Sequence, residues 1–406
     1  MMAVAQKLND GRLLFGHSST RGDGLSQVDG LAVRLALCQF RSVDGATDYN
    51  GVIMTGSTLG VGILGAGSVT QAIHLPTLAR LRDVFHIASV MDVDANIAQS
   101  VAGRVGADWT TDVDELLADD RVQIVVVCSP HQFHAAQVIA ACRAGKQAVL
   151  CEKPFAMSQS EAEEIAKVSM ETGVPIIVGA MHTFDPGWLA AKDNWGDLVN
   201  IAHTIRYSIV LPPNSRFEDF ATEIITRPVS PQRDRTDPEV AAGMIRGGIM
   251  GLAIHDLPLV RTFCPDFTDL EVLSAQVLSP SGYLVNLRIG DRNVQVHGVN
   301  TSGWRPDWIF EAIGDEASLR IDFSPSYVQA GSATAVLRRA NRSEVYGPYP
   351  YNGYEGEWRY LAALARGAAD PLDVATLIDD LTFAVEVADR ASEFVRDAMT
   401  PVGAAA

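Results

Sequence analysis

Short apolar runs alternate with helical segments between Leu59 and Gly179, and this alternation constrains the fold more than any other feature of the sequence. Runs typical of buried strands lie at 59–64, 85–91, 122–128, 147–151 and 175–178, with a shorter one at Trp109. Apolar residues at helical spacing occur at 69–82, from 95 onward, and at 112–118, 131–143 and 159–171. Apolar strands separated by helices form a parallel sheet with both faces covered. The sequence therefore predicts an α/β domain of right-handed βαβ units over residues 54–179.

The segment between the first strand and the first helix has the form of a phosphate-binding turn. It reads Gly65-Ala66-Gly67-Ser68-Val69-Thr70. The first glycine permits a tight turn, the second lets the backbone approach a pyrophosphate, and the helix start supplies N–H groups and a positive dipole end. Thr70 replaces the third glycine of the dinucleotide fingerprint, and a purely structural turn is the alternative. We expect residues 65–69 to bind a dinucleotide, which makes this a Rossmann domain.

An acidic residue, Asp92, ends the second predicted strand about 25 residues after Gly67. A carboxylate there accepts hydrogen bonds from both ribose hydroxyls of an adenosine and repels a 2′-phosphate. No Arg follows closely, so NAD is favoured over NADP as the cofactor. The alternative role is capping of the next helix, for which Asp94 is better placed.

Beyond Val178, strand-like runs follow one another without helices between them. They lie at 199–210, 270–278, 283–289, 293–299, 308–313 and 318–323. This pattern predicts a large, mainly antiparallel sheet with one covered face. The polar stretch 218–239 is expected to be a loop, and helices at about 354–367 and 373–396 complete an α+β domain over residues 180–399.

Residues 1–53 differ in composition from the rest of the chain. The stretch 9–30 is rich in Gly, Ser and Asp, has no sustained periodicity, and lacks the features of a secretory signal. Met54 stands directly before the first convincing strand. We expect translation to start at Met54 and residues 1–53 to be an artefactual or disordered extension; a real flexible arm is the alternative.

Composition limits the partners. A chain of 406 residues exceeds what one hydrophobic core usually serves, which favours two domains. The net charge of −17 repels nucleic acid and anionic lipid, and no apolar run is long enough to cross a bilayer, so neither nucleic acid nor membrane is expected as a partner. The five cysteines are scattered without a C-x-x-C pair, which suits a cytoplasmic protein and predicts no metal site.

Two motifs lie on either side of the predicted helix 131–143. The first reads Ser129-Pro130-His131-Gln132-Phe133-His134, and the second reads Ala144-Gly145-Lys146-Gln147-Ala148-Val149-Leu150-Cys151-Glu152-Lys153-Pro154. They resemble the T/S-P-x-x-x-H turn and the AGK-x-V-x-x-EKP signature of the Gfo/Idh/MocA oxidoreductases. The resemblance extends from Leu59 to about Met399 and is loose in the C-terminal half.

The resemblance implies a nicotinamide site at these motifs. The residues that would contact the cofactor are Ser129, Pro130, His131, His134, Glu152 and Lys153. Glu152 would hold the nicotinamide ribose, and Lys153 would also act as the acid/base group. Physical reasoning agrees, because ligands bind beyond the carboxyl ends of parallel strands and a partly desolvated lysine can lose its charge. A solvated surface lysine is the alternative for Lys153.

The segment from Gly247 to Pro258 resembles the family's glycine-started helix with D-x-x-x-H, whose Asp and His would face the substrate. His255 matches the His, whereas Gly251 occupies the position of the Asp. We expect His255 to be catalytic, with a core histidine as the alternative. Without the carboxylate, the pKa of Lys153 should fall, or water should fill the space left by Gly251. His182 and Asp185 are candidate substrate-binding residues in compensation, and capping is their alternative role.

The resemblance implies hydride transfer between NAD and a secondary alcohol carbon of a sugar, cyclitol or related polyol. Lys153 would take the hydroxyl proton, and His255 would orient the hydroxyl. Two alternatives are a non-catalytic, NAD-binding regulatory protein and a glycosidase that uses bound NAD. A homodimer or homotetramer, often built on the second sheet, is also implied.

Overall fold

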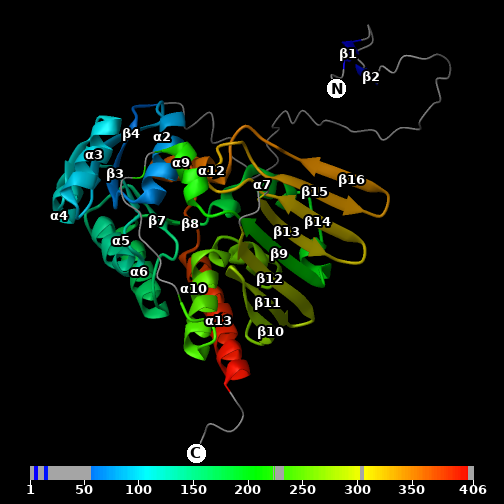
Figure 1. Cartoon of the computed structure of the whole chain (residues 1–406). Coiled ribbons are helices and arrows are strands. Elements are labelled where there is room, and N and C mark those ends of the chain that lie inside the picture. Colours follow the sequence, from blue (N-terminus) through cyan, green and yellow to red (C-terminus); the bar gives the residue numbers. More distant parts are fainter. Residues whose placement is uncertain are drawn as a thin grey trace, which may run out of the picture. The chain divides into compact units, whose positions relative to one another are not determined.

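The computed structural model describes residues 4–7, 13–16, 56–222, 224, 233–301 and 306–400 (Figure 1). Contacts divide the chain into two units, Met1–Ala46 and Thr47–Ala406. In the first unit, strands β1 (Val4–Lys7) and β2 (Leu13–Gly16) form an antiparallel pair. The rest of the predicted extension and the predicted start at Met54 lie outside the described residues.

A six-stranded parallel sheet forms the core of the N-terminal domain. Its order is β5-β4-β3-β6-β7-β8, and every neighbouring pair is parallel. The strands are β3 (Leu59–Leu64), β4 (Phe85–Met91), β5 (Asp108–Thr110), β6 (Ile124–Val127), β7 (Ala148–Glu152) and β8 (Ile176–Gly179). The chain order reverses at β3 and β6, which opens a crevice at their carboxyl ends where ligands of such sheets bind. The predicted Rossmann-type sheet is confirmed.

Side-chain caps mark the start of three of the five α-helices of this domain. They are α2 (Leu75–Arg80), α3 (Ala95–Val105), α4 (Val113–Ala118), α5 (His134–Arg143) and α6 (Gln159–Thr172). Asp94 caps α3 by accepting the N–H of Asn96, so it takes the capping role that the sequence assigned to it. A π-helical turn, Thr70–His74, precedes α2, and Leu75 N–H donates to Thr70 O. Pro76 follows at once and lacks a backbone donor, which accounts for the irregular turn.

The second domain contains an eight-stranded sheet in the order β10-β11-β12-β9-β13-β14-β15-β16. The strands are β9 (Thr204–Leu211), β10 (Glu271–Leu278), β11 (Ser281–Ile289), β12 (Arg292–Asn300), β13 (Asp307–Ile313), β14 (Ala317–Asp322), β15 (Thr334–Arg339) and β16 (Arg342–Tyr346). Only β12 and β9 pair in parallel. The predicted, mainly antiparallel sheet is confirmed, although β15 and β16 were not predicted.

Short helices replace parts of two segments that the sequence predicts differently. The predicted strand 199–210 begins as α8 (Leu198–Ile201), and only its second part is β9. The predicted loop at 218–239 starts within α9 (Ser215–Ala221) and ends within α10 (Pro238–Gly251). Four residues are too few for their spacing to distinguish a helical turn from the start of a strand.

The segment expected to be one glycine-started helix is broken. Helix α10 begins well before Gly247 and ends at Gly251, a 3₁₀ turn spans Ala253–His255, and α11 spans Leu257–Phe263. Pro258 explains the break, because it cannot donate the helical hydrogen bond of its position. Among the described residues, no single helix is long and apolar enough to cross a membrane; α10 through His255 together with α11, bent by 73°, meets that test only as a pair and only in length and composition.

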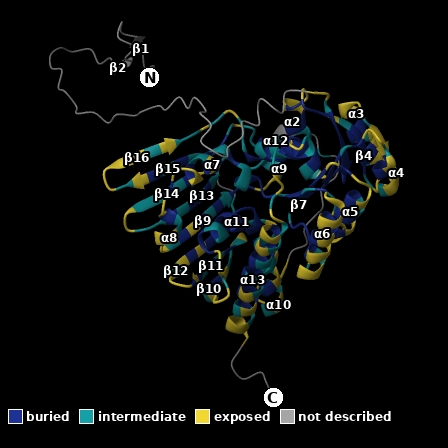
Figure 2. Cartoon of the chain, turned by 180° about the vertical axis from the view of Figure 1, so that it is seen from behind, coloured by how far each residue is buried: buried dark blue, intermediate teal, exposed yellow. Residues whose placement is uncertain are grey.

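The last two helices pack against both sheets. Helix α12 (Gly353–Ala365) contributes Trp358 and Leu361 to the core of the N-terminal sheet, next to Phe85. Helix α13 (Val374–Met399) contributes Leu377 to that domain and Phe383 to the core of the second sheet. In Figure 2 the strands are largely dark blue or teal, whereas outward faces of α3, α4 and α6 are yellow. The predicted boundary after residue 179 therefore separates the two sheets, but not the helices that cover them.

Two adjacent glycines in α10 should respond oppositely to alanine. An added Cβ at Gly248 would lie 2.7 Å from the buried ring of Tyr283, which also lies against Gly298, whereas a Cβ at Gly247 would meet nothing within 4 Å. We expect Gly248→Ala to lower the free energy of unfolding by about 1–3 kcal/mol. Gly247→Ala should raise it by about 0.5–1 kcal/mol, because alanine restricts the unfolded chain and favours the helix. Urea unfolding measures both, and equal effects would contradict the packing described.

Candidate active site

Gly65 and Thr70 fix the conformation of the turn after β3. Gly65 has a φ of 95°, and a Cβ there would lie 2.6 Å from the backbone nitrogen of Ser129. Thr70 Oγ1 donates to Gly65 O at 2.6 Å. Thr70 therefore ties the helix to the turn at the position where the fingerprint has its third glycine. A Cβ on Gly67 would meet nothing within 4 Å, so open space lies beside the helix start.

Asp92 lies beside this turn. Its Oδ2 accepts the N–H of Ala66 at 2.9 Å, and its Oδ1 accepts the N–H of Asp94 at 3.0 Å. Each carboxylate oxygen can accept a further hydrogen bond. The side chain is thus fixed next to the turn and can still accept hydrogen bonds from ligand hydroxyls.

The loop after β6 contains the first family-like motif. Ser129 Oγ donates to Gln137 Oε1 at 2.6 Å, and His131 lies exposed beside the ring of His134. His134 itself is fully buried, with Nδ1 at 2.7 Å from Pro154 O and Nε2 at 2.7 Å from Ser129 O. His134 therefore links the loops after β6 and β7 and fixes their relative positions.

A buried chain of hydrogen bonds holds Glu152 at the end of β7. Trp358 Nε1 donates to His74 Nδ1 at 3.2 Å, which leaves His74 Nε2 to donate to Glu152 Oε1 at 3.1 Å. Burial raises the pKa of Glu152, but the hydrogen bond from His74 and the nearby charge of Lys153 outweigh it, so the net shift is downward. Glu152 is therefore held as a carboxylate.

Glu357, on α12, is an unpartnered acid beside this chain. It is completely buried, and within the described part of the chain neither of its carboxyl oxygens has a hydrogen-bond partner. Burial raises the pKa of Glu357 well above its ordinary value; His74 opposes that rise and the charge of Glu152 adds to it. Glu357 is therefore a neutral carboxylic acid in the folded protein.

Lys153 lies between the two domains. Its Nζ donates to the carbonyl oxygen of Gly251 at 2.8 Å, and the side chain is half-buried. Removal from water lowers the pKa of the Lys153 ammonium, and the Glu152 carboxylate opposes this effect. The direction is the one expected when Gly251 replaces an acidic residue. A Cβ on Gly251 would meet nothing within 4 Å, so the space next to the lysine is open.

The charge of Lys153 affects the pKa of His255. The ring is buried, and its Nδ1 has no hydrogen-bond partner among the residues that the structure describes. Burial, followed by the charges of Lys153 and His182, keeps the pKa of His255 well below its ordinary value. His255 is thus a neutral imidazole that can accept or donate a hydrogen bond to a ligand.

The two residues expected to compensate for Gly251 have different environments. Asp185 caps α7 (Pro186–Lys192) by accepting the N–H of Gly187 at 2.8 Å, and it also accepts the N–H of Ala333. Its contacts are those of a capping residue. His182 Nδ1 instead lies 2.6 Å from Oδ1 of the fully buried Asp256.

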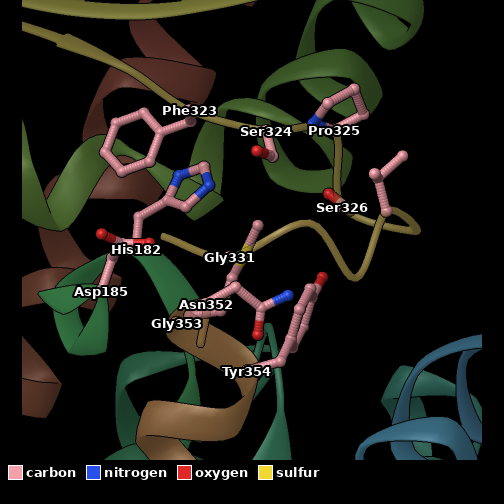
Figure 3. Close-up of a pocket in the computed structure, with 12 residues that line it drawn as sticks. His182, Asp185, Phe323, Ser324, Pro325, Ser326, Gly331, Asn352, Gly353 and Tyr354 are labelled. Carbon is pink, nitrogen blue, oxygen red and sulfur yellow. The ribbon is translucent and has the colours of Figure 1, made fainter. Parts of the chain in front are cut away.

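A pocket of about 260 Å³, including its open mouth, lies beside His182 and Asp185. The other lining segments follow β14 and begin α12, and they include Phe323, Ser326 and Tyr354 (Figure 3). Hydroxyl and imidazole groups therefore border an apolar wall, which is the usual lining of a small-molecule site.

Sequence reasoning missed several residues of this region. They are His74, Gln137, Asp256, Trp308, Glu357 and Trp358. His74, Gln137, Asp256 and Trp308 contact predicted residues directly. Trp358 bonds His74, and Glu357 lies close enough to His74 and Glu152 for their charges to affect its pKa. A buried acid such as Glu357, inside an otherwise ordinary amphipathic helix, gives no signal before the helix is placed.

The sequence matches a known family model and several characterised relatives. The model of the oxidoreductase family Gfo/Idh/MocA, with an NAD-binding Rossmann fold, matches residues 59–180. The 4-carboxy-2-hydroxymuconate-6-semialdehyde dehydrogenase of Sphingobium sp. is 39% identical over 31% of this chain and 39% of its own length. Inositol 2-dehydrogenase 3 of Saccharopolyspora erythraea is 30% identical over 55% of this chain and 57% of its own length. The matched region thus spans 39–57% of these two relatives.

Solved structures resemble more than four-fifths of the chain. A 3-ketoreductase from Actinomadura kijaniata, in complex with NADP and TDP-benzene, superposes with a TM-score of 0.60 at 20% identity, covering 81% of this chain and 96% of that one. A UDP-N-acetylglucosamine 3-dehydrogenase from Acidithiobacillus ferrooxidans gives 0.62 at 18% identity, covering 83% and 99%. At these identities the likeness shows the fold.

Replacement of Glu357 by glutamine should make stability less dependent on pH. An acid whose pKa is raised in the folded state costs stability as pH rises from its unfolded value, near 4.5, toward its folded value. In that window, we expect the free energy of unfolding of Glu357→Gln to rise relative to that of the wild type by at most about 1.4 kcal/mol per pH unit. Urea unfolding at pH 5 and pH 8 measures the gain.

Glu355→Gln on the same helix is the matched control for this prediction. Glu355 is buried but paired with Arg80 at 2.9 Å and Arg359 at 2.6 Å, so its neutralisation should destabilise the fold. If the difference in the free energy of unfolding between Glu357→Gln and wild type stays constant from pH 5 to pH 8, Glu357 is not a neutral acid in the folded protein.

Proposed function

Because the chain belongs to the Gfo/Idh/MocA oxidoreductase family, we propose that it is an NAD-dependent dehydrogenase or reductase acting on a secondary alcohol of a sugar, cyclitol or related polyol. The observation that carries this proposal is the position of Lys153. It is half-buried at the carboxyl end of β7, next to Glu152, with a lowered pKa and open space beyond Gly251.

The residues around the phosphate-binding turn fit a nicotinamide dinucleotide. Open space at Gly67 leaves room for a pyrophosphate at the helix start, and Asp92 can accept hydrogen bonds from a ribose. The carboxylate of Asp92 supports NAD rather than NADP, because it would repel a 2′-phosphate. Glu152, held as a carboxylate, can accept hydrogen bonds from the hydroxyl groups of the second ribose. When bound, the dinucleotide would supply the hydride acceptor or donor.

In the oxidising direction, the neutral amine of Lys153 accepts the proton of the substrate hydroxyl as the carbon loses its hydride. The lowered pKa increases the fraction of Lys153 that is neutral near physiological pH. The neutral ring of His255 holds the same hydroxyl by a hydrogen bond. In the reducing direction, the ammonium form of Lys153 returns the proton to the carbonyl oxygen.

The names of relatives support a polyol or sugar as substrate. They include inositol 2-dehydrogenases, a 3-ketoreductase and a UDP-N-acetylglucosamine 3-dehydrogenase. One relative is a semialdehyde dehydrogenase, so aldehydes belong in a substrate screen. Gly251 favours a second candidate, a non-catalytic protein that binds NAD as a ligand, because the acidic side chain of the resembling motif is missing.

The first experiment is a fluorescence titration with NADH and NADPH, followed by an absorbance screen against sugars, cyclitols and aldehydes. Preferential binding of NADH with turnover of a polyol supports the proposal. Tight binding without turnover on any compound favours the regulatory protein. Release of free sugar from a glycoside, with cofactor retained, would point to a glycosidase, and the absence of binding by either cofactor would refute the proposal.

Lys153→Met should abolish most turnover while preserving the binding of NADH. We expect kcat to fall by about 10²–10⁴-fold, since the acid/base group is lost. In the wild type, the rate of alcohol oxidation should rise with pH to an apparent pKa below 10.5, and this rise should disappear in the variant. Lys167→Met, at an exposed position on α6, is the matched control and should behave as wild type. An unchanged kcat in Lys153→Met would exclude the assigned role.

A further inference from the structure

His182 and Asp256 form a second group of buried polar side chains near Lys153. Asp256 is fully buried; its Oδ1 lies 2.6 Å from His182 Nδ1, and its Oδ2 accepts Trp308 Nε1–H at 2.6 Å. Burial of a carboxylate is costly unless both oxygens are hydrogen-bonded. The two ring N–H groups therefore stabilise the carboxylate of Asp256 in the interior.

The contact with Asp256 decides which nitrogen of His182 carries the hydrogen. A carboxylate can only accept, so Nδ1 donates, and Nε2 of the neutral ring keeps its lone pair. The ring also stacks on Phe323, with centroids 3.8 Å apart, and meets the edge of Trp308 at 4.8 Å. His182 is thus an oriented hydrogen-bond acceptor.

Nε2 of His182 remains available to a ligand. Within 56–222, 233–301 and 306–400, no residue forms a hydrogen bond with Nε2, although the side chain is only 5% exposed. The ring lies in the pocket wall, and Figure 3 shows it between Phe323 and the segment Ser324–Ser326. His182 borders the pocket, so a ligand hydroxyl in it can donate a hydrogen bond to Nε2.

His182 and the residues around the proposed acid/base group meet at Trp308. The rings of His182 and His255 both pack edge-on against Trp308, with centroids 4.8 and 6.0 Å from it, and Lys153 bonds Gly251, four residues before His255. The space beyond Gly251 is open, and Gly251 has no side chain to contact a ligand. A molecule with one hydroxyl at Lys153 and His255 can therefore present another group to His182.

We propose that His182, oriented by Asp256, accepts a hydrogen bond from a second hydroxyl of the substrate, on a carbon other than the one oxidised. This inference rests on the proposed function and restricts the substrate to molecules with at least two hydroxyl groups. Asp256 is a positioning residue, because it acts only through His182. The pair supplies polar recognition of the substrate where Gly251 offers only its backbone.

Two substitutions separate the roles of the two ring nitrogens. In His182→Asn, the amide N–H can replace Nδ1–H and keep the bond to Asp256, but Nε2 is lost. In Asp256→Asn, the amide donates to His182 Nδ1, so the hydrogen moves to Nε2 and the acceptor becomes a donor. Asp256→Asn preserves the size of the buried side chain, whereas His182→Asn shortens it and removes the ring that stacks on Phe323, so folding is tested separately by thermal unfolding.

The assay compares the polyol that the wild type oxidises, with myo-inositol as the first probe, and its monodeoxy derivatives. We expect His182→Asn to lower kcat/KM about 30-fold, mainly through KM. The loss should vanish for the one deoxy compound that lacks the hydroxyl bound by His182. Asp256→Asn should show the same pattern. His297→Asn is the matched control, because among the described residues His297 bonds Ser208 Oγ alone, at 2.8 Å, on the second sheet.

A ¹⁵N NMR spectrum of the imidazole rings tests the orientation independently of turnover. The wild type should show His182 protonated at Nδ1 and not at Nε2, and Asp256→Asn should reverse this. Addition of polyol to the NADH complex should shift the Nε2 signal of the wild type.

The possible outcomes distinguish the inference from the proposed function. Equal losses of kcat/KM for the parent polyol and for every deoxy compound would overturn the inference and leave the dehydrogenase intact. Absence of turnover by the wild type would refute the proposed function. In that case a shift of Nε2 on addition of polyol still supports the binding role of His182, and an unmoved signal rejects it.

Discussion

The hydrogen-bond chain from Trp358 through His74 to Glu152 connects the parts on which the site depends. It joins α12, the helix that begins at the phosphate-binding turn, and the end of β7. Because the indole N–H occupies Nδ1 of His74, the imidazole can only donate to Glu152 and holds it as a carboxylate. That carboxylate in turn opposes the loss of charge at Lys153. A C-terminal helix thus influences the protonation of the central lysine through two side chains.

Burial sets the protonation of the other groups around this chain. Lys153 and His255 both have lowered pKa values, since removal from water disfavours their charged forms. Burial raises the pKa of Glu357 instead, because the neutral form of an acid is the protonated one. Two bases with lowered pKa values and one acid with a raised pKa therefore surround the carboxylate of Glu152. This distribution suits proton transfer to and from a bound hydroxyl near neutral pH.

Two departures from the resembling motifs are each matched by a contact. Thr70 replaces a glycine, and its hydroxyl bonds the carbonyl of Gly65. Gly251 replaces an aspartate, and its carbonyl accepts the Lys153 ammonium. The acidic group instead occurs at Asp256, next to His255, where it is satisfied by His182 and Trp308. The site therefore keeps its polar character although its acidic side chain lies at a different position.

The sequence alone determined the parallel sheet and the turn at Gly65, because periodicity and glycine spacing are local properties of the chain. It also indicated Asp92, Glu152, Lys153 and His255 as candidate site residues, since each lies in a short motif. Only the tertiary structure decided what these residues contact. Helix α10 ends at Gly251 and leaves His255 on a separate 3₁₀ turn. Packing of α12 brings Trp358 and Glu357 beside His74 and Glu152, and folding of the second sheet brings Trp308 to Asp256. Such pairings join residues far apart in the chain, so burial and hydrogen bonding in three dimensions, rather than spacing, set their charges and roles.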